Sequence, residues 1–165
     1  DDLQSVVPVG PIGGFPPTLP LQFGNNGSGN AYGFELHGQL EVTEAWRLDA
    51  WYAFLKLDLN GTGSDFTTQH DSPINTAFLM SAWNITPKTE IDVISRYVDS
   101  LAGSNVPRYI NLDLRLGYKA TDNLYLSVLG QNMLDAHHAE FRDQNNFTAA
   151  SQVRRGVFGQ LEYRY

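Results

Sequence analysis

Oxygen-bearing side chains in one polar stretch have part of the spacing of a calcium-binding loop. Asp58, Asn60 and Thr62 occupy alternate positions, and Gly63 follows where the EF-hand loop makes its sharp turn. The twelfth position is Gln69, whereas that loop needs a glutamate that binds calcium through both carboxylate oxygens. The flanking residues alternate between apolar and polar types, which predicts strands where the EF-hand has helices. We therefore predict a flexible outer loop here and no calcium site.

Imidazole and carboxylate groups also gather at His137, His138 and Glu140, and both groups bind several transition metals. Adjacent side chains on an extended segment point to opposite sides, so the two histidines of one strand cannot share an ion. We predict no metal site and no cofactor.

Nucleophilic catalysis would require a serine or a cysteine beside a histidine. The chain has no cysteine, and no motif ties Ser95 or Ser127 to a histidine. His37 lies among alternating residues, which favours a hydrogen-bonded wall position over a catalytic base. The sequence therefore predicts no catalytic residue and a protein that is not an enzyme. The net charge of −7, from 18 acidic and 11 basic residues, disfavours nucleic acid as a partner.

The elements that position these side chains show strict alternation of apolar and polar residues. From Ile110 to Tyr118 every even position is apolar or aromatic, whereas Asn111, Asp113 and Arg115 occupy odd positions. The pattern predicts seven antiparallel strands, at residues 32–42, 46–54, 74–85, 91–97, 110–119, 124–128 and 153–165.

Short turns and long polar connections alternate between these strands. The turns are predicted at residues 43–45, 86–88 and 121–123, and the connections at 60–73, 101–108 and 135–150 are longer and rich in Gly, Asn, Asp and Ser. A Gly- and Pro-rich run at 8–30 precedes them. All the long connections therefore fall at one end of an up-and-down sheet, which is the layout of an outer-membrane barrel.

Charges and aromatic rings indicate which face of the sheet meets water. An Arg or Lys that faces lipid near the bilayer midplane would cost about 2–4 kcal/mol, so the polar face, with charges of both signs, must be wet. The apolar face ends in aromatic residues, as at the two interfaces of a membrane. These are Trp46, Tyr118, Tyr163 and Tyr165 beside the short turns, and Tyr32 and Tyr97 toward the long connections. The pattern favours a transmembrane barrel over a soluble lipocalin-like binder.

Several motifs, spread over residues 25–165, together resemble the barrel of TonB-dependent outer-membrane receptors of the siderophore-receptor type. Residues 106–118 (VPRYINLDLRLGY) resemble the antepenultimate strand of that family. Residues 128–135 (VLGQNMLD) resemble the end of its penultimate strand, and HAEF follows as in that family. Residues 154–165 (RRGVFGQLEYRY) resemble its last strand, and NAYGFEL at residues 30–36 resembles an earlier strand start.

The resemblance implies a fold and a function. Members of this family form a 22-stranded barrel preceded by a TonB box and a plug domain, and 165 residues suffice for about seven or eight strands. We therefore expect residues 1–165 to be the C-terminal β-barrel portion, without the plug domain and the N-terminal strands. The implied function is TonB-dependent transport, most often of a ferric siderophore or similar chelate, across the bacterial outer membrane. The implied partners are TonB through the plug, the barrel-assembly machinery, membrane lipid and lipopolysaccharide.

The same resemblance implies that outer loops and plug together catch the ligand. The residues of this chain that would contribute lie in or beside the long connections: Phe66, His70, Arg108, Tyr109, His137, His138 and Phe141. The C-terminal signal read by the assembly machinery would comprise Gly159, Leu161, Tyr163 and Tyr165, with Tyr in the last position where Phe is commoner in that family.

Two alternatives compete with this interpretation. A self-contained eight-stranded structural or adhesive barrel would require residues 1–9 to pair along residues 151–165. Pro8 and the Gly- and Pro-rich run after it make that segment a poor ladder partner, which favours part of a larger barrel. An outer-membrane enzyme is disfavoured because no serine or aspartate is tied to a histidine by a motif.

Overall fold

The computed structural model of the protein describes residues 2–10, 13, 20–61, 70–142 and 151–165. These residues contain ten strands: β1 (Asp2–Pro8), β2 (Leu21–Thr43), β3 (Trp46–Gly61), β4 (Asn75–Thr86), β5 (Thr89–Val98), β6 (Tyr109–Lys119), β7 (Leu124–Gln131), β8 (His137–Phe141), β9 (Ser151–Arg154) and β10 (Gly156–Tyr163). Eight of them form one antiparallel sheet in the order β1-β2-β3-β4-β5-β6-β7-β10, and β8 pairs with β9. In the described part of the chain, no helix is long and apolar enough to cross a membrane.

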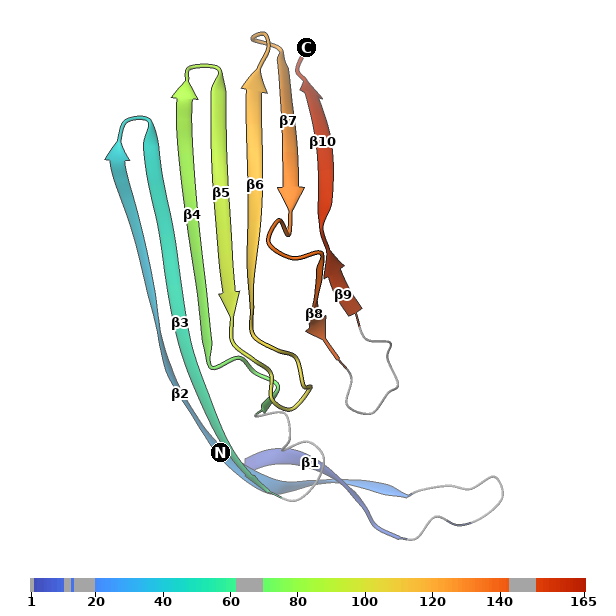
Figure 1. Ribbon diagram of the computed structural model, residues 1–165. Helices are drawn as coiled ribbons and strands as arrows, with labels where there is room; N and C mark the ends of the chain where they lie inside the picture. The colour runs from blue at the N-terminus through green and yellow to red at the C-terminus, as the bar shows by residue number, and fades with distance from the viewer. Residues whose placement is uncertain (1, 11–12, 14–19, 62–69, 143–150) are drawn as a thin grey trace.

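The two ends of the sheet are unequal, as the sequence predicts. Tight turns join β2 to β3, β4 to β5 and β6 to β7 at the upper end, and longer connections lie at the lower end (Figure 1). Thr43, Thr86 and Thr121 begin these turns, and the Oγ1 of each accepts a hydrogen bond from the backbone N–H two residues later, at 3.2, 3.2 and 3.3 Å. A threonine hydroxyl thus fixes each turn through a local side chain to backbone bond. The prediction of an antiparallel up-and-down sheet is confirmed.

The register of β5 and β6 places apolar and charged residues on opposite faces of the sheet. Val93 lies opposite Ser81 on one neighbouring strand and Leu114 on the other, whereas the adjacent Asp92 lies opposite Arg115. We call the first side the apolar face. It comprises the even positions of β2, β3, β6 and β7 and the odd positions of β4, β5 and β10. The other side is the charged face.

Burial on β6 is the reverse of that in a water-soluble sheet. Asn111 and Asp113, on the charged face, are each 5% exposed, whereas Ile110 and Leu116, on the apolar face, are each 49% exposed. Soluble proteins bury their aliphatic residues and rarely leave a large continuous apolar surface in water. The apolar face therefore needs a non-aqueous environment, and the polar side chains need one another.

Aromatic residues gather in two groups on the apolar face. Near the tight turns, the rings of Trp46 and Trp83 lie 6.1 Å apart. Toward the long connections, the ring of Phe34 lies 5.8 Å from those of Tyr52 and Phe54. Amphipathic rings at both ends of an apolar band are typical of the two interfaces of a membrane. The alternation predicted Trp46 for this group, and the structure adds Trp83 from the neighbouring strand.

The predicted start of the first strand is wrong. β2 begins at Leu21, not at Tyr32, so much of the run at 8–30 that was predicted as a connection is paired backbone. Its glycine-rich first part pairs with β1 on one side and with the end of β3 on the other. Ladder hydrogen bonds use backbone groups and do not depend on side chains. β1 pairs with β2 and lies at the opposite edge of the sheet from β10, so it does not pair along the last strand. Pro8 is the last residue of β1, where a missing N–H is tolerated.

The predicted connection at 135–150 and the predicted last strand need correction as well. Residues of that connection form β8, and the last strand is interrupted at Arg155, so that β9 pairs with β8 while β10 pairs with β7. The backbone N–H of Arg155 donates to the carbonyl of Ala136 at 3.1 Å. A hydrogen bond to the connection, instead of to β7, separates the two halves of the predicted strand.

Candidate functional site

A network of charged residues spans three strands of the charged face near the tight turns. Arg115 Nη1 lies 2.8 Å from Glu90 Oε1 and 2.6 Å from Asp92 Oδ2, and its Nη2 donates to Tyr125 Oη at 2.5 Å. Tyr125 Oη also donates to Glu90 Oε1. One guanidinium thus satisfies two carboxylates and a phenol, which explains why so many charges are tolerated on a part-buried face.

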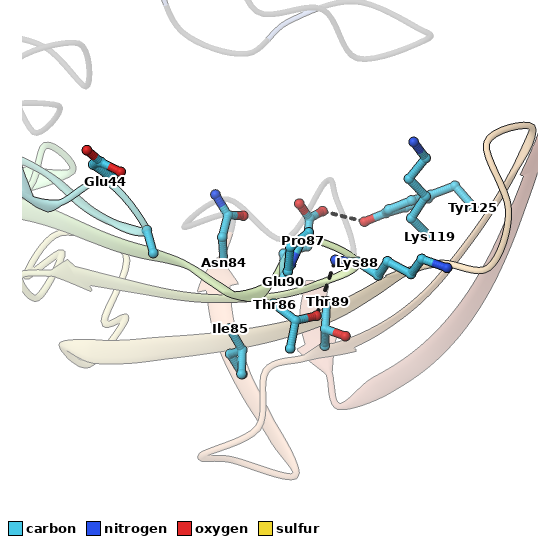
Figure 2. Close-up of a pocket in the computed structure, with 11 residues that line it drawn as sticks. Glu44, Asn84, Ile85, Thr86, Pro87, Lys88, Thr89, Glu90, Lys119 and Tyr125 are labelled. Atoms are coloured by element: carbon cyan, nitrogen blue, oxygen red, sulfur yellow. Dashed lines mark hydrogen bonds between the residues drawn. The ribbon is translucent and has the colours of Figure 1, made fainter.

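A pocket of about 530 Å³ lies beside this network at the turn end of the sheet. Figure 2 shows Glu90 and Tyr125 pointing toward each other at its wall, with Lys88 and Lys119 nearby and Glu44 farther along. Lysines and carboxylates line it without any histidine or cysteine.

At the opposite end of the charged face, the structure brings two of the predicted site residues together. The rings of Tyr109 and His138 stack with their centroids 4.3 Å apart. His138 Nε2 lies 3.1 Å from Glu140 Oε1, so this nitrogen donates to the carboxylate. The two stacked rings come from β6 and β8, which are separated in the chain. Their role in ligand binding stays a prediction.

The residues after β7 make hydrogen bonds to β6 beside this arrangement. Asn132 has a φ of 52° and is fully buried, and its N–H donates to Asp113 Oδ1 at 2.9 Å. Met133 N donates to the Leu112 carbonyl at 2.8 Å. Asparagine is among the few residues that adopt positive φ readily, so its place at the end of a strand was a signal for this turn. Sequence reasoning identified the motif but not the contacts of Asn132 or Asp113.

The long connections contact one another around Asn75. Tyr52 Oη donates to Asn75 Oδ1 at 2.6 Å, and Asn75 Nδ2 donates to Asp99 Oδ2 at 2.9 Å. The Gly103 N–H donates to the His70 carbonyl at 2.9 Å, which joins the connection before β4 to the one after β5. The predicted site residue His70 therefore lies in a connection that its neighbours hold in place.

The contact at Asp99 predicts a pH dependence. The Asn75 amide, and then the Ser100 N–H, hold the pKa of the Asp99 carboxyl below its usual value of 3.8. A carboxyl with a lowered folded-state pKa stabilises the folded form above its unfolded pKa and loses that contribution as the pH falls through the folded one. We expect amide hydrogen exchange in residues 99–106 to accelerate as the pH falls below 3.8, after correction for intrinsic exchange. Asp99→Asn should remove this acceleration, and the same profile in both proteins would contradict the assignment.

The other predicted site residues lie as follows. Arg108 precedes β6, and His137 and Phe141 begin and end β8 at the long-connection end. Phe66 lies outside the described residues. Gly159, Leu161 and Tyr163 lie on the apolar face of β10, and Tyr165 is exposed beyond it.

The remaining predictions concern a metal site, a calcium-loop-like stretch and the position of His37. The described residues contain no group of three or more His, Asp and Glu placed to hold a metal. Part of the calcium-loop-like stretch, 62–69, lies outside them. His37 Nε2 lies 3.2 Å from Asp49 Oδ1, which agrees with the predicted hydrogen-bonded wall position.

The antiparallel sheet, its reversed burial and its two aromatic groups are the features of the wall of an outer-membrane β-barrel, and they define the class of the protein. No family model matches the chain. A curated relative from Acinetobacter baumannii, described as a probable TonB-dependent siderophore receptor, PiuA, is 21% identical over 164 residues and covers 88% of this chain and 22% of that protein.

Solved structures are similar too. The ferric-catecholate import receptor Fiu of Escherichia coli K12 has a TM-score of 0.69 and 19% identity, over 85% of this chain and 21% of that chain. The ferripyoverdine receptor of the outer membrane of Pseudomonas aeruginosa has a TM-score of 0.65 and 16% identity, over 88% and 20%. The chain thus spans about a fifth of the length of these relatives. In fold and in sequence it is similar to TonB-dependent siderophore receptors, so the resemblance predicted from its motifs is confirmed.

Proposed function

We propose that the chain is the C-terminal β-barrel portion of a TonB-dependent siderophore receptor of the bacterial outer membrane. It supplies barrel wall and outer connections, and no catalytic step. The observation that carries the proposal is the reversed burial on β6, with Asn111 and Asp113 enclosed and Ile110 and Leu116 exposed. The similarity to siderophore receptors supports it at the level of the ligand class.

The apolar face then contacts lipid and lipopolysaccharide, and the charged face contacts the plug and the water-filled lumen. TonB acts through the plug, and the barrel-assembly machinery reads the C-terminal signal at Tyr165. A ferric siderophore or similar chelate binds near the long connections, where the part-exposed ring of Tyr109 stacks on the buried ring of His138. The alternative of a self-contained eight-stranded barrel receives no support from relatives that extend far beyond the matched fifth.

Uptake of radioactive iron tests the proposal. Cells that express the complete protein should take up iron from at least one of a panel of catecholate, hydroxamate and mixed ferric siderophores. Cells without the gene, or without TonB, should lose that uptake. Unchanged uptake in both strains would contradict the proposed function.

The role of the aromatic stack is tested separately. Tyr109→Ala should weaken binding of that siderophore by about three- to tenfold, because an aromatic contact contributes about 1 kcal/mol. His138→Ala should weaken it as well, because it removes the ring that positions Tyr109. His37→Ala is the control, since His37 contacts Asp49 on another part of the charged face. The amount of each variant in the outer membrane is measured in parallel. Wild-type affinity in both stack variants would refute the ligand role and leave the receptor function intact.

A further inference from the structure

Residues 132–138, which we call the strap, connect β7 to β8 and contact β6 near both ends of the strap. Two backbone hydrogen bonds fix the start of the strap, from Asn132 N to Asp113 Oδ1 at 2.9 Å and from Met133 N to the Leu112 carbonyl at 2.8 Å. The stack of His138 on Tyr109 fixes its end. These contacts therefore lie on either side of Asn111 along β6.

Three buried polar atoms at the strap have no hydrogen-bond partner in the described structure: Asn111 Oδ1, Asn132 Oδ1 and His138 Nδ1. Their residues are 5%, 0% and 9% exposed. Buried polar atoms are almost always hydrogen-bonded, to protein or to ordered water, because an unmade bond costs free energy. All three residues belong to β6 or to the strap, so a single partner can account for the three atoms.

The three atoms belong to residues that adjoin one another. Asn111 lies between Tyr109 and Asp113 on the same face of one strand, since side chains two residues apart share a face. Asn132 contacts Asp113 and His138 contacts Tyr109, so the strap residues flank Asn111 from both sides.

All three atoms are hydrogen-bond acceptors. Asn132 Nδ2 donates to the Val153 carbonyl at 3.3 Å, which leaves its Oδ1 to accept. His138 Nε2 donates to Glu140, and in the neutral ring this tautomer leaves Nδ1 as an acceptor. Acceptors cannot satisfy one another, so the missing group must be a donor.

We propose that the strap and β6 enclose an ordered water site, held by Asn111 Oδ1, Asn132 Oδ1 and His138 Nδ1. A buried water usually makes about three hydrogen bonds to protein atoms that would otherwise be unsatisfied. A metal ion fits the surroundings less well, because Asp113 is paired with Arg96 at 3.1 Å and Glu140 with His138. The water ties the strap, and with it the β8–β9 hairpin, to the wall of the sheet.

A high-resolution crystal structure of the full-length protein tests the site directly. Solvent density at hydrogen-bond distance from at least two of the three atoms is expected. An enclosed space without density, direct pairing of the three residues with other side chains, or density with the short contacts of a metal would each overturn the proposal.

Substitution of Asn111 distinguishes a water site from a dry one in solution. If Asn111 Oδ1 were unpartnered, Asn111→Leu would leave the strap as protected as before or more so. With a bound water, Asn111→Leu should expel it and speed amide exchange at Met133 and Arg155 about tenfold or more. Asn84→Leu is the matched control, an exposed asparagine on the same face. Unchanged or slower exchange in Asn111→Leu would overturn the proposal.

A second substitution guards against a general folding defect. His138→Phe keeps a ring against Tyr109 but removes the Nδ1 acceptor, so it should speed exchange at the same two amides. If both residues hold the same water, the double variant should exchange no faster than the more affected single variant. Additive effects of the two substitutions would contradict a shared site.

Discussion

Replacing Leu79 by arginine is expected to prevent stable insertion of the complete receptor into a bilayer, whereas arginine at the adjacent Met80 is tolerated. Both residues lie near the centre of β4, at the same depth on opposite faces. Leu79 is 46% exposed on the apolar face, opposite Ala50. An arginine that faces lipid near the midplane costs about 2–4 kcal/mol. Met80 lies opposite Asp49 on the charged face, so an arginine there gains a carboxylate neighbour.

The measurement is the unfolding free energy of the full-length protein in lipid vesicles, together with the amount of folded protein in outer-membrane fractions. Leu79→Arg should lose about 2–4 kcal/mol and much of the membrane fraction, and Met80→Arg should lose about 1 kcal/mol or less. A larger loss for Met80→Arg than for Leu79→Arg would mean that the charged face is the one that meets lipid. It would overturn the assignment of the two faces.

The alternation of residue types was sufficient to predict the faces and most of the strands. Leu112, Leu114 and Leu116 share the apolar face as expected, because side-chain direction in a strand depends only on parity. The turns were predictable for a similar reason. Each begins with a threonine whose hydroxyl bonds to the backbone two residues on, which is a local interaction that needs no knowledge of the rest of the fold.

The alternation of residue types failed to predict strand pairing where the backbone pairs independently of its side chains. The glycine-rich start of β2 shows no alternation, yet it pairs with β1 and with the end of β3. The last strand alternates except at Arg155, yet its two halves pair with different partners. In both cases the position of neighbouring backbone decides the pairing, and a single sequence does not contain that information.

The candidate site was predictable in part for the same reason. Tyr109 and His138 could be named because the family motifs contain them, but their stacking depends on how the strap turns at Asn132. The burial of Asn111 and Asp113 was not predictable from alternation, which places them on a wet face and says nothing about the segment that covers them. Long-range contacts of this kind require the structure.

Glycine at position 117 illustrates such a contact and leads to the second prediction. A Cβ at this position would collide with the hydroxyl of Tyr125 and would lie 2.8 Å from both Cγ and Oε1 of Glu90. The tyrosine side chain therefore crosses the space that any other residue would fill, and from there it bonds to Arg115 and Glu90. An aromatic ring over a strand glycine is a known way to compensate for the missing side chain.

Gly117→Val is therefore expected to displace Tyr125 and to open the Glu90–Arg115 network. Overpacking costs about 1–3 kcal/mol, and each lost bond to a charged group about 1.5–3 kcal/mol, so the combined loss should be about 2–4 kcal/mol after partial relaxation. The measurement is denaturant unfolding of the full-length protein in detergent. Gly38→Val is the control, because a Cβ at Gly38 meets no atom within 4 Å.

The unfolding free energy lost through Gly117→Val is then measured again in the Tyr125→Ala variant. If Gly117 is required because Tyr125 occupies the space above it, Gly117→Val should cost clearly less once the ring is gone, since the two residues are in contact and their effects are coupled. The remaining conflict with Glu90 is easier to relieve, because a carboxylate on a flexible chain can rotate away. An equal cost in both backgrounds would mean that the glycine is required by the backbone of β6, and that the Arg115 network forms without its help.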